Sequence, residues 1–77
     1  MDKNTIVKTS LTEIAWRDED ETKPTELSFD VRAIFLYDFN GPSPMLMSLQ
    51  DCKDIMKAYV LDELGWAIED CSLEISV

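Results

Sequence analysis

The stretch TELSFDVRAIFLYDF, residues 25–39, carries the clearest secondary-structure pattern in the chain. Apolar side chains occupy every second position from Leu27 to Phe39, which is the period of a β-strand with one buried face. The positions between them begin polar and become apolar at Ile34 and Leu36. The sequence therefore predicts one long strand whose second half is apolar on both faces.

A second strand is predicted before this one. Residues 4–16, NTIVKTSLTEIAW, are rich in Thr, Ile and Val, which favour extended structure. Val7, Thr9 and Leu11 share one parity, whereas Ile14 and Trp16 have the opposite one. A change of parity within a strand indicates a bulge or bend, which we expect near Thr12 and Glu13.

The segment between the two strands, RDEDETKPTE at residues 17–26, holds five acidic side chains. Asp18 to Glu21 are four consecutive acids, and Pro24 cannot donate a hydrogen bond to a β-ladder. We interpret the segment as the solvated loop of a hairpin. Ordered carboxylates elsewhere are better candidates for contact with a partner, because holding a mobile loop costs conformational entropy.

A helix is predicted after the long strand. The sequence NGPSP, residues 40–44, is typical of a loop, and we interpret it as the point where the chain leaves the sheet. Ser48 has the place of an N-cap with Asp51 three positions later, and Gly65 has the place of the terminating glycine. The helix should run from about Leu49 to Leu64. Its apolar side is formed by Leu49, Cys52, Met56, Tyr59, Val60 and Leu64, with Ile55 at the margin. Leu61 is the exception, since it projects among polar residues.

The final segment, WAIEDCSLEISV, alternates over Cys71, Leu73, Ile75 and Val77, which predicts a third strand. It should begin near Trp66 and be irregular around Glu69 and Asp70. The element order β-β-α-β then predicts a single α+β domain over residues 1–77. We expect a two-layer sandwich in which a three-stranded antiparallel sheet of order 2-1-3 has one helix packed on one face.

The uncovered face of this sheet is expected to be partly apolar. Ile34 and Leu36 should lie on it, with Ile14 or Trp16 as further candidates. Such a face suggests a homodimer or a subunit of a larger complex, unless a terminus or loop covers it.

The charge is strongly negative. Sixteen acidic residues stand against seven basic ones, no histidine is present, and the net charge is −9. This balance excludes direct binding of nucleic acid and of anionic membranes, and it favours basic protein surfaces. From Ala58 onward the chain has no Lys or Arg. The alternative is that the charge serves only solubility.

The residues give no indication of catalysis. Without histidine there is no Ser-His or Cys-His pair, and Cys52 and Cys71 are too few for a zinc site. Both cysteines lie at apolar positions and are expected in the core. The acidic run lacks the residue order of a calcium loop. We therefore expect no enzyme activity, metal or cofactor. The N-terminal residues lack the apolar core of a signal peptide, and with two cysteines this favours the cytoplasm.

Two functional hypotheses follow. In the first, the protein is an inhibitor that occupies a basic, nucleic-acid-binding type of site on a partner protein, in its extreme form as a nucleic-acid mimic. In size, charge and element order the chain resembles the small acidic α+β proteins that bacteriophages and mobile elements direct against host defence or transcription machinery. An antitoxin that neutralises a basic nuclease is a variant of this hypothesis. In the second, the protein is an assembly module that binds through the apolar sheet face. The predicted contact residues are Asp51, Asp54, Asp62, Glu69, Asp70, Glu74, Ile34 and Leu36.

Overall fold

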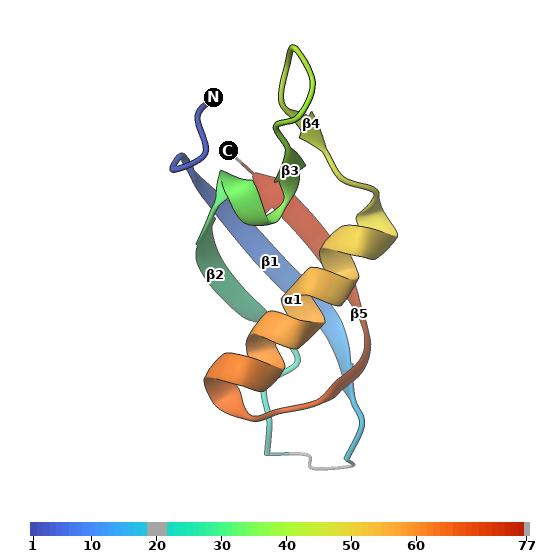
Figure 1. Cartoon of the computed structure of the whole chain (residues 1–77). Helices are drawn as coiled ribbons and strands as arrows, with labels where there is room; N and C mark the ends of the chain where they lie inside the picture. The colour runs from blue at the N-terminus through green and yellow to red at the C-terminus, as the bar shows by residue number, and fades with distance from the viewer. Residues whose placement is uncertain (19–21, 77) are drawn as a thin grey trace.

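The computed structural model describes residues 1–18 and 22–76 (Figure 1). Its elements are β1 (Ile6–Trp16), β2 (Leu27–Arg32), the 3₁₀-helix η1 (Ala33–Phe35), β3 (Tyr37–Asp38), β4 (Met45–Leu46), α1 (Leu49–Leu64) and β5 (Ile68–Ser76). β1 is the central strand of an antiparallel sheet of order β2-β1-β5, and α1 crosses one face of it (Figure 1). The predicted α+β sandwich with sheet order 2-1-3 is confirmed.

The core lies between α1 and one face of the sheet. On that face Val7 is paired with Val31, and Leu11 is paired with Leu27 on one side and Leu73 on the other. The side chains of α1 that are at most 1% exposed are Cys52, Met56 and Val60. Burial of a large aliphatic side chain contributes roughly 1.5–3 kcal/mol, so this apolar face supplies most of the driving force for folding.

A polar residue lies within this core. Thr9 is fully buried in the central strand, and its hydroxyl donates a hydrogen bond of 3.0 Å to the backbone oxygen of Phe29. A buried hydroxyl without a partner would cost free energy, so this bond explains how threonine is tolerated there.

Two irregularities interrupt the β1–β5 ladder, as the sequence predicts. Between Thr12 and Ala15, β1 advances three residues while β5 advances two, and Glu13 has a φ of 51°. One step further on, β5 advances two residues, from Asp70 to Ile68, while β1 advances one. The second shift cancels the first and restores the register.

These shifts turn the end of β1 toward the core. Ile14 is 6% exposed, and the half-buried Trp16 packs against the core. The expectation that either residue lies on the uncovered face is therefore wrong. A bulge exchanges the two faces of a strand, so an apolar residue on the outward parity is returned to the buried side.

The strand predicted over residues 25–39 ends seven residues early. β2 stops at Arg32, where the ladder with β1 also ends at Ile6, and the chain enters η1. A 3₁₀-helix has about three residues per turn, so residues three apart point the same way. Ala33 and Leu36 are accordingly both fully buried. The prediction that Ile34 and Leu36 lie on an uncovered sheet face is wrong, because both residues follow the end of β2. Leu36 is buried, and Ile34 is 44% exposed but lies in η1.

A small hairpin follows η1. β3 and β4 pair antiparallel, with Tyr37 opposite Leu46 and Asp38 opposite Met45. The interpretation of residues 40–44 as a simple exit from the sheet is therefore wrong, because they form the turn of this hairpin. Strands of two residues are too short to produce a recognisable alternation in the sequence.

Helix α1 has the predicted bounds and caps. The Ser48 hydroxyl accepts a hydrogen bond of 3.2 Å from the Asp51 backbone N–H. Gly65 ends the helix with a left-handed φ of 71°, and its N–H donates to the Leu61 oxygen at 2.9 Å. Left-handed backbone is the conformation that glycine adopts at little cost.

The 3₁₀ turn predicts very different roles for two residues that a continuous strand would place on the same face. Leu36→Ala should lower the free energy of unfolding by about 2–5 kcal/mol, because it opens a cavity in the core. Ile34→Ala should change it by about 0.5 kcal/mol or less, as is usual for exposed positions. Urea denaturation measures both, and equal losses would contradict the turn.

The two glycines predict a second contrast. Gly65→Ala should destabilise the protein by about 1 kcal/mol, because alanine is strained in left-handed backbone. A Cβ at Gly65 would have no neighbour within 4 Å, so the loss would be conformational rather than steric. Gly41→Ala is the control, since its φ lies outside the left-handed region and its Cβ would meet only the Ser43 oxygen at 3.9 Å. A loss for Gly41→Ala as large as that for Gly65→Ala would refute this account of the cap.

Candidate functional site

The three helical carboxylates predicted to bind a partner lie on the outer side of α1. Asp51, Asp54 and Asp62 are all exposed, and they lie across the helix from the buried Cys52, Met56 and Val60. Leu61 is 53% exposed among them, as predicted. This side of the helix is therefore acidic, with one exposed leucine.

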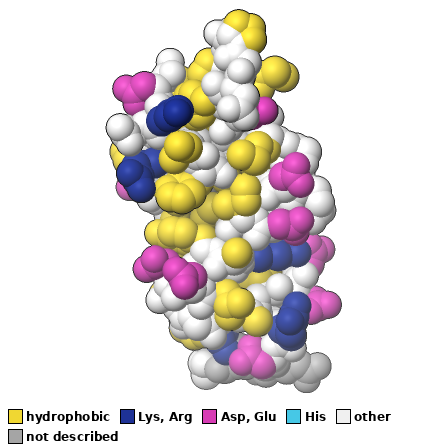
Figure 2. All heavy atoms as spheres, in the orientation of Figure 1, with side chains coloured by type: hydrophobic (Ala, Val, Ile, Leu, Met, Phe, Trp, Pro, Cys, Tyr) yellow, Lys and Arg dark blue, Asp and Glu magenta, His cyan; other side chains and the backbone are white. Residues whose placement is uncertain are grey.

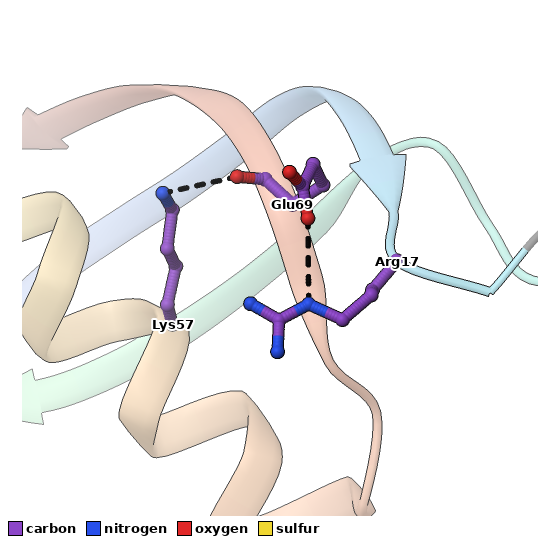
Figure 3. A network of polar contacts seen from close by, with 3 residues as sticks. All are labelled: Arg17, Lys57 and Glu69. Carbon is purple, nitrogen blue, oxygen red and sulfur yellow. Dashed lines mark hydrogen bonds and ion pairs between the residues drawn. The ribbon is translucent and has the colours of Figure 1, made fainter.

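The carboxylates of β5 lie elsewhere. Asp70 and Glu74 are exposed next to the buried Cys71 and Leu73, so they project from the sheet face that α1 does not cover. Glu69 lies at the register shift, where Arg17 Nε is 3.3 Å from its Oε2 and Lys57 Nζ donates to its backbone oxygen at 3.3 Å (Figure 3). Exposed ion pairs of this kind contribute at most about 1 kcal/mol to the stability of the fold. Their effect is to link the start of β5 to β1 and α1.

The six predicted carboxylates therefore do not form one surface. Asp51, Asp54 and Asp62 point away from the sheet, whereas Asp70 and Glu74 point away from the helix. In a two-layer sandwich these directions are opposite. A flat partner that contacts one set cannot contact the other.

The sheet face away from α1 is mainly hydrophilic, with Ile6 as an exposed apolar residue at its end. In register, Lys8 lies between Asp30 and Ser76, and Ser10 lies between Ser28 and Glu74. Antiparallel sheets commonly leave one such polar face to water. The expectation that this face carries Ile34 and Leu36 as an apolar patch is wrong, because the strand that was to carry them ends at Arg32.

Two further carboxylates belong to this open face and were not predicted as contact residues. Asp30 lies beside Lys8, and Glu13 accepts a hydrogen bond of 3.4 Å from the Ser72 hydroxyl. The polar alternation before Arg32 could have indicated Asp30. The change of parity near Glu13 indicates the bulge in the sequence, but it does not indicate the direction that the bulge gives to the Glu13 side chain.

The acidic loop is anchored at both ends. Lys23 Nζ lies 2.9 Å from Asp18 Oδ2 and 5.7 Å from the centroid of the Trp66 ring, and the Lys23 side chain is 8% exposed. Trp16 packs edge-on against Trp66 with 5.4 Å between ring centroids, and its Nε1 donates to the Pro24 oxygen at 2.9 Å. The prediction of a hairpin loop is confirmed by the pairing of β1 with β2. The acids at 19–21 lie outside the described residues.

Exposed apolar side chains gather at the other end of the molecule. Of the nine large hydrophobic residues that are exposed in the described ranges, five lie within residues 34–49. We call this group the apolar end: Ile34, Phe35, Met45, Leu46 and Leu49. Figure 2 shows hydrophobic side chains over this upper part of the molecule and at the tip of the hairpin. A cluster of exposed apolar side chains indicates an interaction site, whereas single exposed apolar residues are common on protein surfaces.

A hollow of about 530 Å³ adjoins the apolar end. Its apolar lining comes from Ile34, Tyr37, Phe39 and Met47, and its polar lining from Lys3, Asp38, Asn40 and Asp51. A smaller hollow of about 140 Å³ shares Asp38 with it. The larger volume is in the range of sites that hold ligands or side chains of a partner.

The two cysteines lie in the core, as predicted. Cys52 is fully buried and Cys71 is 4% exposed, and neither forms a disulfide. Burial raises the pKa of the Cys52 thiol above its ordinary value of 9.0, and the charge of Asp51 raises it further. Burial also raises the pKa of Cys71, although Lys57 and Lys53 oppose this. A protonated, inaccessible thiol is a poor nucleophile.

The described residues contain no group of three or more His, Cys, Asp or Glu side chains arranged to hold a metal ion. Within the same residues, no helix has the length and apolar character needed to cross a bilayer. Comparison of the chain with protein-family models, curated proteins and solved structures finds no match.

The buried thiols predict a dependence on alkaline pH. Their folded pKa values lie above 9.0, so the folded protein keeps these protons when the unfolded chain releases them. The contribution of the buried thiols to stability is therefore fully present below pH 9.0, and it is lost as the pH rises through their folded pKa values. The free energy of unfolding of Cys52→Ala should fall less steeply in this range than that of the wild type. A chromogenic disulfide reagent should react with neither thiol until urea unfolds the protein, and rapid reaction of the folded protein would contradict their burial.

Proposed function

We propose that this protein is a small acidic protein-binding inhibitor, which docks its apolar end at a basic site on a partner protein. The observation that supports the proposal is the concentration of exposed apolar residues at 34–49, beside a hollow lined by Asp38 and Asp51. The partner's site is of the kind that binds nucleic acid, where basic side chains surround a contact surface.

The apolar end and the exposed carboxylates have different physical roles in this proposal. Apolar side chains removed from water at the centre of an interface supply most of the affinity and slow dissociation. The net charge of −9 acts at longer range, where it accelerates the encounter with a basic partner and disfavours acidic ones. The exposed carboxylates of α1 and of the open sheet face serve this second role.

A nucleic-acid mimic remains the stricter form of the first hypothesis. Fewer carboxylates could act together in such a mimic than the sequence suggests, since they lie on two opposite sides of the molecule. A mimic would have to use one side, and the open face with Asp30, Asp70 and Glu74 offers the flatter array.

The alternative is an assembly module, either a homodimer or a subunit of a complex. The exposed apolar end supports it as well, in place of the sheet face that proved mainly hydrophilic. Self-association would bring together two chains of charge −9, which opposes a homodimer and leaves a basic partner as the better proposal. Neither role requires catalysis, and the two free thiols are compatible with action in the cytoplasm.

The test uses a matched pair of leucines. A photo-reactive amino acid at Met45 should identify the partner, whose association and dissociation rates are then measured for each variant. Leu46→Asp in the apolar end should weaken binding about tenfold or more, mainly through faster dissociation. Leu61→Asp on α1 is similarly exposed, at 53% against 47%, and should leave the affinity nearly unchanged.

The charge is tested separately on the open face. Asp30→Asn with Glu74→Gln should slow association and reduce its salt dependence, with little effect on dissociation. If these changes abolish binding while Leu46→Asp does not, the mimic is the correct reading. If Leu46→Asp instead lowers the mass measured by light scattering, the chain is a homodimer.

A further inference from the structure

The hollow beside the apolar end combines apolar walls with carboxylates. Its apolar lining includes Tyr37 and Phe39, whose ring centroids are 6.5 Å apart. Its charged groups are Asp38 and Asp51 against Lys3, which gives −2 + 1 = −1 for the lining. The site is thus apolar in its walls and negative in its charge.

The two carboxylates have no cationic partner among the residues that the structure describes. Among the described residues, neither Asp38 nor Asp51 forms an ion pair, even though Lys3 lines the same hollow. Asp38 Oδ1 accepts a hydrogen bond of 2.8 Å from the Asn40 N–H, which fixes its orientation within the hairpin turn. Both carboxylates can therefore accept hydrogen bonds from a group that enters from outside.

We infer that this hollow receives an arginine side chain of the partner protein, an inference that rests on the proposed function. The guanidinium group is planar and weakly hydrated, and it both pairs with carboxylates and stacks on aromatic rings. The three methylene groups of arginine would lie along Ile34 and Met47, as long basic side chains do on apolar surfaces. A basic partner surface supplies such a residue.

Other occupants fit less well. An aliphatic side chain would take water from Asp38 and Asp51 without replacing its hydrogen bonds. An anion would meet a chain of charge −9, and the carboxylate of Asp51 in the first helical turn offsets the partial positive charge of the α1 N-terminus.

The experiment needs no partner. N-acetyl-arginine methylamide is titrated into the ¹⁵N-labelled full chain, and the amide shifts of Asn40, Met47 and Asp51 are followed by NMR. Saturable shifts at these residues are expected in the millimolar range, which is typical of one anchoring side chain. The citrulline analogue has nearly the same shape without the charge and should bind about fivefold more weakly or worse.

Variants assign the effect to the hollow. Asp38→Asn should weaken arginine binding about fivefold, whereas Asp30→Asn on the open sheet face removes the same charge elsewhere and should have little effect. Lys3→Met makes the lining charge −2 and should strengthen binding about twofold or more. The amide spectrum of each variant shows whether it remains folded.

Two results of the titration would overturn the inference. Equal binding of arginine and citrulline amides would make the hollow a neutral apolar site, and shifts that do not saturate would mean that it is not a site. Failure of the proposed function is detected independently, as an unchanged partner affinity in Leu46→Asp.

Discussion

The packing of Leu36 beneath the first turn of α1 determines the shape of the end on which the candidate site lies. Its side chain is fully buried, and its backbone oxygen accepts hydrogen bonds from the Met47 N–H at 3.0 Å and from the Cys52 thiol at 3.9 Å. These contacts tie η1 to the start of the helix. Because a 3₁₀ turn buries every third residue, the same geometry that buries Ala33 and Leu36 leaves Ile34 and Phe35 exposed.

The opposite end of the sheet depends on a different constraint. β1 must keep an apolar residue on its buried face after its alternation has changed parity at Glu13. The two compensating shifts between β1 and β5 return Ile14 and Ile68 to the core, where they are 6% and 4% exposed. They also place a glutamate at each shift, Glu13 and Glu69, and both carboxylates reach polar groups at the surface: Ser72 and Arg17. The ladder is locally irregular at these two shifts, and the apolar core remains continuous past them.

Charge and apolar contact are separated in this molecule. The acids are spread over the outer side of α1 and the open sheet face, whereas exposed apolar side chains gather at the hairpin end of a body that measures 44 × 19 × 18 Å. A thin, elongated domain with two charged sides has few places where a partner can remove apolar surface from water. The apolar end is such a place, and its hollow joins both kinds of interaction because Asp38 and Asp51 line it.

Local chemistry in the sequence is enough to predict the class of fold and the bounds of α1: the Ser48 cap, the left-handed Gly65, and an alternation long enough to identify β1, β2 and β5. The sequence also predicts the order of the sheet, as the simplest arrangement of the element order, although the β1–β5 pairing joins residues far apart in the chain. It also determined that both cysteines are buried, since each lies on an apolar face. For the candidate site, it identified Ile34 and the helical acids as exposed, but it placed Leu36 with Ile34. The point where β2 ends depends on tertiary contacts, because in sequence its alternation continues to Phe39. The strand stops at Arg32 because β1 begins at the paired Ile6, and because Ala33 and Leu36 then close the core. The hollow, the hairpin and the division of the carboxylates between two sides all follow from that turn and from the packing of α1, which are contacts between residues far apart in the chain.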